Sequence, residues 1–177
     1  MNSNPLTPVW DAYNTSQDAF RITKKAINHP DKVILLKKTQ LRLQSISDAK
    51  TRIIQSNEIT EDLLVLSLWS TYERFVRIYL QQKGAKLQTI QPTVLAHPIY
   101  AYFCDEVEFW KPNQILDLLK KTLFTTQPYL IGQAKQILTY RDWVAHGKNQ
   151  DKQPPSNITA PFAYKILNDI VETLLLN

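Results

Sequence analysis

Glycine is scarce in this chain of 177 residues, which contains only three glycines. Hairpin turns and strand bends depend on residues that adopt positive φ, and glycine supplies this conformation most readily. Apolar residues recur instead at helical spacing over long stretches, and prolines or polar segments separate these stretches. The sequence therefore predicts an all-α protein, an antiparallel helical bundle in a single domain.

The predicted elements follow this periodicity. Residues 1–30 are expected to form an N-terminal helical segment and residues 31–177 the main helical domain. Within that domain we expect helices at 31–55, 60–84, 98–110, 112–124, 128–147 and 160–176, and a loop at 149–157. Asp31 and Thr60 are predicted to cap the first two helices. We expect residues 60–84 to form a long, largely buried central helix that ends at Gly84.

The residues that hold metals and phosphates are scattered. Structural zinc requires four Cys or His ligands at close spacings, whereas this chain has one cysteine and three histidines placed singly. The glycines are isolated, so neither a P-loop nor a dinucleotide-binding motif is present. The neighbouring acids Asp105, Glu106 and Glu108 are interpreted as solvated groups rather than as paired catalytic acids. No metal site and no cofactor are expected.

The composition predicts a cytoplasmic protein. Cys104 is the only cysteine, so it cannot form an intramolecular disulfide, which suits a reducing compartment. The first residues show neither the basic nor the apolar region of a signal peptide. No run approaches the roughly 18 apolar residues of a membrane span, and no membrane partner is expected.

The net charge of +5 comes from the first third of the chain. Residues 1–57 hold nine Lys/Arg against four Asp/Glu, and residues 58–177 hold twelve of each. Such an excess can attract a polyanion such as RNA, although lysines on a solvated helix face produce the same count. The candidate RNA-binding residues in this region are Lys24, Lys25, Lys37 and Lys38.

The stretch YRDWVAHGK, Tyr140 through Lys148, is the strongest candidate for a functional site. Gly147 fits the position that follows a helix C-terminus. In a purely structural interpretation, the helix dipole stabilises His146, and Arg141 is a surface ion-pair residue. Alternatively, both side chains reach one phosphodiester. Histidine can then move a proton near neutral pH, and arginine can neutralise phosphate oxygens as negative charge builds.

The second interpretation predicts a dimer. RNA carries its own nucleophile, the 2′-hydroxyl, so such a site needs no metal. A single histidine cannot act as general base and general acid in one step without moving. A twofold dimer would bring two copies of the stretch to one interface.

The motif resembles that of the HEPN superfamily, which consists of all-helical bundles with an Arg-polar-x-x-Ala-His-Gly sequence near the end of a late helix. RDWVAHG supplies Arg141, Asp142, Ala145, His146 and Gly147 at these places. The stretch LWSTYERFVRIYL is similar to the central helix of RiboL-PSP-type HEPN proteins, in which an acid is flanked by aromatic residues. The likeness covers roughly residues 31–177.

The resemblance implies a metal-independent endoribonuclease, active as a homodimer, that is a toxin or a phage-defence effector. It assigns catalytic roles to Arg141 and His146, makes Asp142 a polar orienting residue, and makes Glu73 the aromatic-flanked acid. Glu73 can equally be paired with Arg74 or Arg77 of its own helix. The homodimer is expected to form through the face that carries Arg141 and His146.

Two expectations concern partners. Members controlled by a nucleotidyltransferase antitoxin have a modified tyrosine two residues after the histidine, where this chain has Lys148. A different antitoxin or regulatory protein is therefore expected, and Lys148 joins the candidate RNA-binding residues. The alternative to a nuclease is a non-catalytic HEPN-fold module, an antitoxin or RNA-binding adaptor, in which the motif serves as a helix cap and dimer contact.

Overall fold

The computed structural model describes residues 3–148, 156 and 158–177, and within these residues the protein is helical without strands. The predicted all-α class is confirmed. In chain order the elements are α1 (Thr7–Ile27), α2 (Lys32–Leu35), α3 (Ile46–Gly84), the 3-10 helix η1 (Ala85–Thr89), α4 (Thr93–Phe109), α5 (Pro112–Lys121), α6 (Pro128–Ala145) and α7 (Ala160–Leu176). Most of the predicted loop at 149–157 lies outside the described residues. No described helix is long and apolar enough to cross a membrane.

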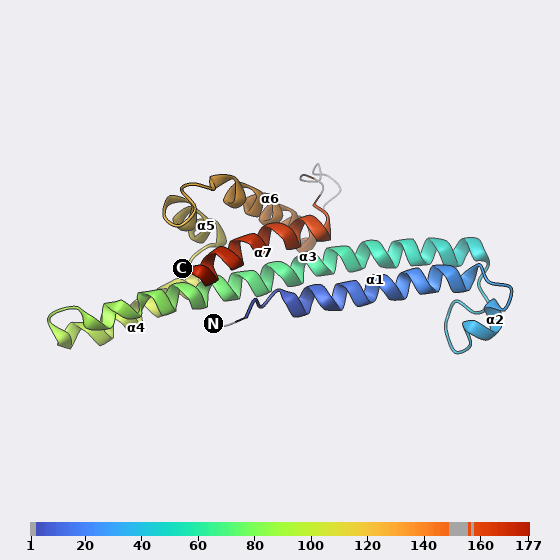
Figure 1. Cartoon of the computed structure of the whole chain (residues 1–177), viewed down its shortest axis with the longest axis horizontal. Helices are drawn as coiled ribbons and strands as arrows, with labels where there is room; N and C mark the ends of the chain where they lie inside the picture. The colour runs from blue at the N-terminus through green and yellow to red at the C-terminus, as the bar shows by residue number, and fades with distance from the viewer. Residues whose placement is uncertain (1–2, 149–155, 157) are drawn as a thin grey trace.

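Helix α3 runs through most of the molecule and forms its axis (Figure 1). Its 39 residues span about 58 Å at 1.5 Å per residue. The predicted helix start at Thr60 is wrong, because no proline or glycine interrupts Ile46–Lys83. The Thr60 hydroxyl donates to the Ser56 carbonyl inside the helix, at 2.8 Å. The cap is Ser45, whose hydroxyl oxygen accepts from the Asp48 backbone N–H at 3.0 Å.

The predicted helix at 31–55 is wrong as a single element. Residues 46–55 are helical as the start of α3, but between Asp31 and Ser45 only the single turn of α2 forms, and the Asp31 side chain caps nothing. The chain then reverses so that α1 and α3 can lie antiparallel (Figure 1). Leu36 turns inward in this reversal and joins a small separate core with Ile27, Ala49 and Ile53. Tertiary packing therefore overrides the helical periodicity of this segment.

The second half of α3 is enclosed by the C-terminal helices. Helices α6 and α7 pack beside it, α5 packs on α6, and α1 lies along its other side (Figure 1). The largest fully buried side chains of this main core include Trp69, Tyr72, Phe75 and Phe124. Trp10 of α1 stacks on Tyr164 of α7 with ring centroids 4.3 Å apart, which ties the N-terminal helix to the C-terminal one.

Helix α3 ends at Gly84 as predicted, but the reason for a glycine there differs from the predicted one. The φ of Gly84 is −67°, an ordinary helical value. A Cβ atom at Gly84 would instead collide with the ring of Phe103 on α4. Glycine is therefore needed here for the close approach of two helices.

Helix α4 begins at Thr93, five residues before the predicted start at Pro98. Pro98 is exposed inside the helix, so the backbone hydrogen bond that it cannot make lies on the solvent side. The following helix, α5, ends at Lys121 rather than at the predicted Phe124, whose side chain is buried in the main core.

Candidate functional site at the end of α6

The end of α6 has the geometry that the sequence predicts. Helix α6 stops at Ala145, with His146 as its C-cap. Gly147 follows with φ +75°, the left-handed conformation that glycine adopts without strain. The Lys148 N–H donates to the Trp143 carbonyl at 2.9 Å and the Gly147 N–H to the Val144 carbonyl at 3.0 Å. This pair of bonds is a Schellman motif, which fixes where the chain turns after His146.

Arg141, in the last turn of α6, points toward an acidic side chain of α3. Its Nη2 atom lies 4.0 Å from Glu73 Oε2, and its Nη1 atom donates to Asp142 Oδ1 at 2.8 Å. The structure therefore brings three predicted site residues together, from two helices 68 positions apart in the chain. The guanidinium lies between two carboxylates, in direct contact with Asp142 and at the outer limit of an ion pair with Glu73.

Glu73 has structural partners as well. Its Oε1 atom accepts from Arg77 Nη2 at 2.6 Å and its Oε2 atom from the Trp69 indole N–H at 2.9 Å. Residues 69, 73 and 77 follow each other at four-residue spacing, which places them on one face of α3. Of the two possible arginine partners on α3, Arg77 is the one found, because Arg74 pairs with Glu108 at 2.9 Å.

Arg77 is buried and closes the end of a neighbouring helix. It donates to the backbone carbonyls of Val107, of Glu108 at 3.0 Å and of Trp110 at 2.9 Å. These carbonyls belong to the last turn and C-cap of α4, where no helical N–H remains to satisfy them. Arg77 thus joins α4 to Glu73 and, through Glu73, to Arg141.

His146 is exposed at the tip of α6. Within the described residues no hydrogen bond or ion pair joins it to Arg141. An exposed imidazole at a helix C-terminus is accessible to a ligand or to a second chain. Among the described residues, no three His, Cys, Asp or Glu side chains gather closely enough to hold a metal ion.

Lys148 is held against the protein. Its Nζ atom lies 2.5 Å from Asp62 Oδ2 on α3 and 5.4 Å from the centre of the Trp143 ring. The same carboxylate accepts from the Tyr140 hydroxyl at 2.8 Å. Burial, and next the hydrogen bond to Asp62, raise the pKa of Tyr140 well above its usual value. Asp62 therefore fixes both flanks of the motif to α3.

Glu61, the neighbour of Asp62, likewise connects α3 to other helices, on the other side of α3. It accepts from the Tyr13 hydroxyl of α1 and from the Ala160 backbone N–H at the start of α7, the latter at 3.2 Å. Neither Glu61 nor Asp62 is assigned a role from the sequence, and the contacts of both residues depend on how the helices pack. The one available signal was a pair of adjacent acids inside an uninterrupted helical pattern, and such acids are ordinarily solvated.

The candidate RNA-binding lysines of the N-terminal region lie far from this site. Lys24 and Lys25 are exposed at the end of α1, and Lys37 and Lys38 are exposed after α2. This region packs with Ala49 at the start of α3, 24 residues before Glu73. The helical rise places the two regions roughly 35 Å apart. A bound RNA would need to span that distance to contact both within one protomer.

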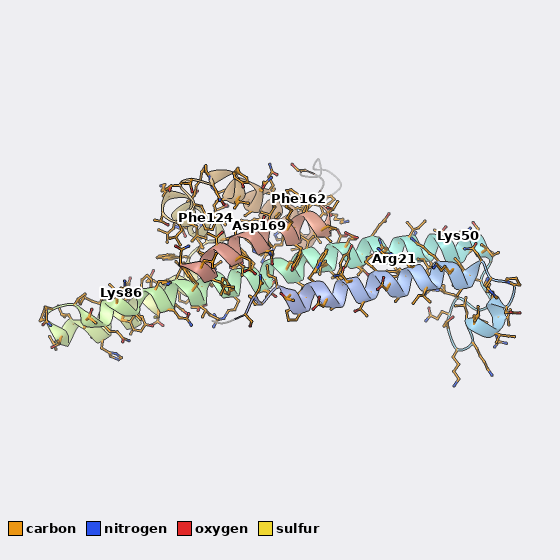
Figure 2. The ribbon with its side chains drawn as sticks, in the orientation of Figure 1. Arg21, Lys50, Lys86, Phe124, Phe162 and Asp169 are labelled. Atoms are coloured by element: carbon orange, nitrogen blue, oxygen red, sulfur yellow. The ribbon has the colours of Figure 1, made fainter. Side chains whose placement is uncertain are left out.

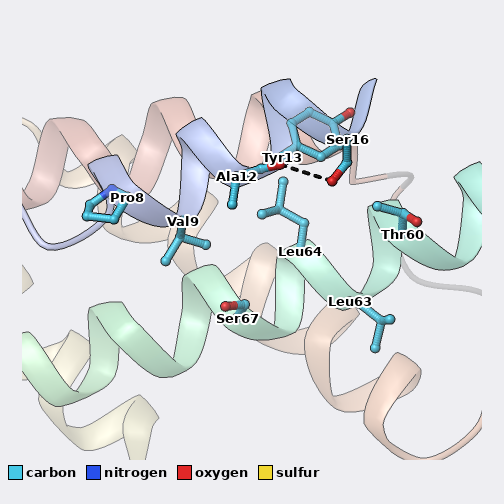
Figure 3. A pocket seen from close by; sticks show the side chains of 9 residues that line it. All are labelled: Pro8, Val9, Ala12, Tyr13, Ser16, Thr60, Leu63, Leu64 and Ser67. Carbon is cyan, nitrogen blue, oxygen red and sulfur yellow. Dashed lines mark hydrogen bonds between the residues drawn. The ribbon is translucent and has the colours of Figure 1, made fainter. Parts of the chain in front are cut away.

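One side of α3 is left uncovered next to the Glu73–Arg141 pair. Ile59 and Leu63 are exposed there, and Leu66 and Ser70 continue the same face at helical spacing. A groove of about 440 Å³ lies between this side and α1 (Figure 3). Figure 3 shows the lining residues, which are Pro8, Val9, Ala12, Tyr13, Ser16, Thr60, Leu63, Leu64 and Ser67. The lining and the adjoining face carry no formal charge.

Comparison with protein-family models, with curated proteins and with solved structures found no match for this chain.

Proposed function

We propose that this protein is a metal-independent endoribonuclease of the HEPN type, acting as a toxin or phage-defence effector. The observation that carries the proposal is the convergence of Arg141 and Asp142 of α6 with Glu73 of α3, beside an exposed His146 on the same helix end. These are the residues that the motif and the central-helix resemblance single out, and they come from distant parts of the chain.

In the proposed reaction the RNA 2′-oxygen attacks the adjacent phosphorus. The new O2′–P bond forms while the P–O5′ bond breaks, which leaves a 2′,3′-cyclic phosphate and a 5′-hydroxyl end. One His146 accepts the 2′-hydroxyl proton, and the His146 of a second protomer donates a proton to the leaving O5′ atom. Arg141 neutralises the charge that builds on the phosphate oxygens. Glu73 and Asp142 orient the guanidinium, and Arg77 and Trp69 hold Glu73 in place.

The proposed homodimer uses the uncovered side of α3. Ile59, Leu63 and Leu66 form an uncharged apolar face, which is self-complementary when two copies meet around a twofold axis. Glu73 lies about 60° around α3 from Ser70, at the edge of this face. Contact through the face would bring the two α6 ends near each other, as a site with two His146 side chains requires.

A non-catalytic HEPN-fold module is the second candidate, and one observation favours it. The cations of the motif already have carboxylate partners, since Arg141 lies between Glu73 and Asp142 and Lys148 is paired with Asp62. Compensated cations attract a phosphate less strongly than free ones. In this case the motif would anchor α6 and form a contact with an antitoxin or another partner.

The Arg141→Ala variant separates the two candidates. If the protein is a nuclease, RNA cleavage in the presence of EDTA falls by about 10²–10³-fold, because the charge that stabilises the transition state is lost. The matched control is Arg74→Ala, which removes an exposed arginine of α3 that pairs with Glu108. Expression of the wild type should arrest growth, and expression of Arg141→Ala should not. Cleavage by Arg141→Ala at the wild-type rate would contradict the nuclease proposal, and harmless expression of both proteins would favour the module.

A further inference from the structure

The positive charge of the chain is concentrated at one end of the molecule. We call residues 22–52, which comprise the end of α1, α2 and the start of α3, the hairpin end. It holds eight Lys/Arg against two Asp/Glu, a net charge of +6, whereas the other 146 residues hold thirteen against fourteen. Figure 1 shows the hairpin end projecting beyond the packed helical body, and Figure 2 shows Lys50 at this end, on the far side of the molecule from Phe124.

The hairpin end also exposes aliphatic side chains, which is unusual for so charged a surface. Ile34 is 71% exposed and Leu43 is 86% exposed, and Val33, Leu35 and Ile46 are about half exposed. None of these five residues belongs to the small core of Ile27, Leu36, Ala49 and Ile53. Scattered apolar residues are normal on a surface, but five exposed aliphatic residues within positions 33–46, at one projecting end of the molecule, are typical of an interaction site.

The chemistry of this surface favours a lipid bilayer over a nucleic acid or a second copy. Single-stranded RNA is bound by basic residues together with aromatic side chains that stack on bases, and the hairpin end contains no Phe, Trp or Tyr. The aliphatic side chains would gain nothing from a phosphate backbone. Two copies of a surface with a charge of +6 repel each other. An anionic bilayer instead offers phosphate groups to the lysines and an apolar boundary to the aliphatic side chains.

We propose that the hairpin end adsorbs to the surface of an anionic lipid bilayer. Lys24, Lys25, Lys37 and Lys38 contact the head groups, while Ile34 and Leu43 enter the boundary with the acyl chains. The protein lies on the membrane without crossing it. The sequence-based expectation of no membrane partner rests on the lack of a spanning segment, and the proposal goes beyond it for surface adsorption alone. The proposal does not depend on the proposed nuclease activity.

Vesicle co-sedimentation of the full chain tests the proposal at low salt. The vesicles are phosphatidylcholine alone, or phosphatidylcholine with about one third phosphatidylserine. Wild type should bind only the anionic vesicles. Each lysine near such a surface contributes roughly fivefold to the partition coefficient, so Lys37→Gln/Lys38→Gln should bind roughly 25-fold more weakly. Ile34→Ser/Leu43→Ser should bind at least about tenfold more weakly.

Matched controls come from the helical body. Lys120→Gln/Lys121→Gln removes two exposed lysines of α5, and Val94→Ser/Leu176→Ser removes two exposed aliphatic side chains. Both should bind within about twofold of wild type, because they lie outside the contact surface. Circular dichroism of every variant checks that its helices are intact.

Three results would overturn the proposal. The first is equal binding, or none, to the two kinds of vesicle. The second is full binding by Ile34→Ser/Leu43→Ser, which would reduce the effect to non-specific charge attraction. The third is loss of binding to an RNA oligonucleotide in the lysine variant of the hairpin end while wild type ignores the vesicles. That result would assign the surface to RNA.

Discussion

The two halves of α3 have different surroundings, although they belong to one uninterrupted helix. The second half is packed on several sides, and its large aromatic side chains fill the main core. The first half pairs chiefly with α1 and is closed by a small core of four residues, Ile27, Leu36, Ala49 and Ile53. The candidate site lies on the second half, and the basic aliphatic surface lies at the outer end of the first half.

The two surroundings suit two different roles. A site that must hold Arg141 against Glu73 benefits from a surrounding of buried helices, because packing fixes the rotamers of its side chains. A surface that adsorbs to a bilayer needs exposure and charge rather than a deep core. The proposed site and the proposed bilayer surface could therefore share one helix that is enclosed at one end and open at the other.

The largest expected effect is on the main core. Phe75→Ala should lower the free energy of unfolding by about 3–5 kcal/mol, because it removes a fully buried ring from between packed helices. Ile53→Ala should lower it less, by about 2 kcal/mol, with the loss confined to the hairpin end. Denaturant unfolding measures the first change, and amide hydrogen exchange of α1 and α2 measures the second. Equal loss of exchange protection throughout the protein in Ile53→Ala would show that the two halves unfold as one unit.

The next effect compares two arginines of α3. Arg77→Ala should destabilise the protein by about 3 kcal/mol, because it leaves Glu73 and the carbonyls at the end of α4 without their buried donor. Arg74→Ala breaks an exposed pair with Glu108, so it should change stability by less than about 1 kcal/mol. Urea titrations of both variants measure the difference. Similar midpoints would mean that the Glu73–Arg77 network adds little to the fold.

Smaller effects on stability are expected at two glycines of the α6 region, and the two effects have opposite signs. Gly147→Ala should destabilise the protein by about 1 kcal/mol, because φ at this position is +75°. Gly132→Ala should stabilise it by a similar amount, since Gly132 lies inside α6 and an added Cβ meets nothing within 4 Å. Thermal unfolding of the two variants provides the measurement. A stabilising Gly147→Ala would argue against the left-handed turn that ends α6.

The smallest effect is an alkaline loss of stability. Burial is the main cause that raises the pKa of Tyr13, Tyr72 and Tyr140 above the ordinary value of 10.0. A raised pKa in the folded state means that stability is fully present below pH 10 and is lost as pH rises toward the folded value. Tyr140→Phe should flatten this dependence in unfolding experiments between neutral pH and about pH 11. An unchanged slope would mean that Tyr140 ionises equally in the folded and unfolded states.

The sequence predicts the helices of the enclosed half better than those of the open half. The end of α6, its glycine turn and the course of α7 follow from local signals, because Gly147 and the apolar pattern act within a few residues. The segment after Asp31 continues the helical spacing of apolar residues in the sequence. It nevertheless folds back, because Leu36 packs against residues distant in the chain. Ser45 and Asp48 signal the start of α3, yet a continuous apolar pattern obscures that signal.

The candidate site divides in the same way. The motif indicates Arg141, Asp142 and His146 directly, and the resemblance of the central helix indicates Glu73. The hydrogen-bond and ion-pair partners of these residues cannot be predicted from the sequence, because they depend on how the helices pack. Asp62 binding Lys148 and Tyr140, and Arg77 joining Glu73 to the end of α4, are consequences of tertiary packing. Gly84 is an example of what the sequence cannot show. Glycine is needed at this position because of the nearby ring of Phe103, and not because of its own dihedral angles.

The central claim is most directly tested by the rate of RNA cleavage by His146→Ala in the presence of EDTA. The control is His97→Ala, which removes an exposed histidine of α4, far from the motif in sequence. The proposed mechanism predicts that His146→Ala loses about 10²–10⁴-fold in rate while remaining folded and of wild-type oligomeric state, and that His97→Ala cleaves like wild type. Undiminished cleavage by His146→Ala, or an equal loss in both variants, would contradict the assignment of His146 as the proton-transfer group.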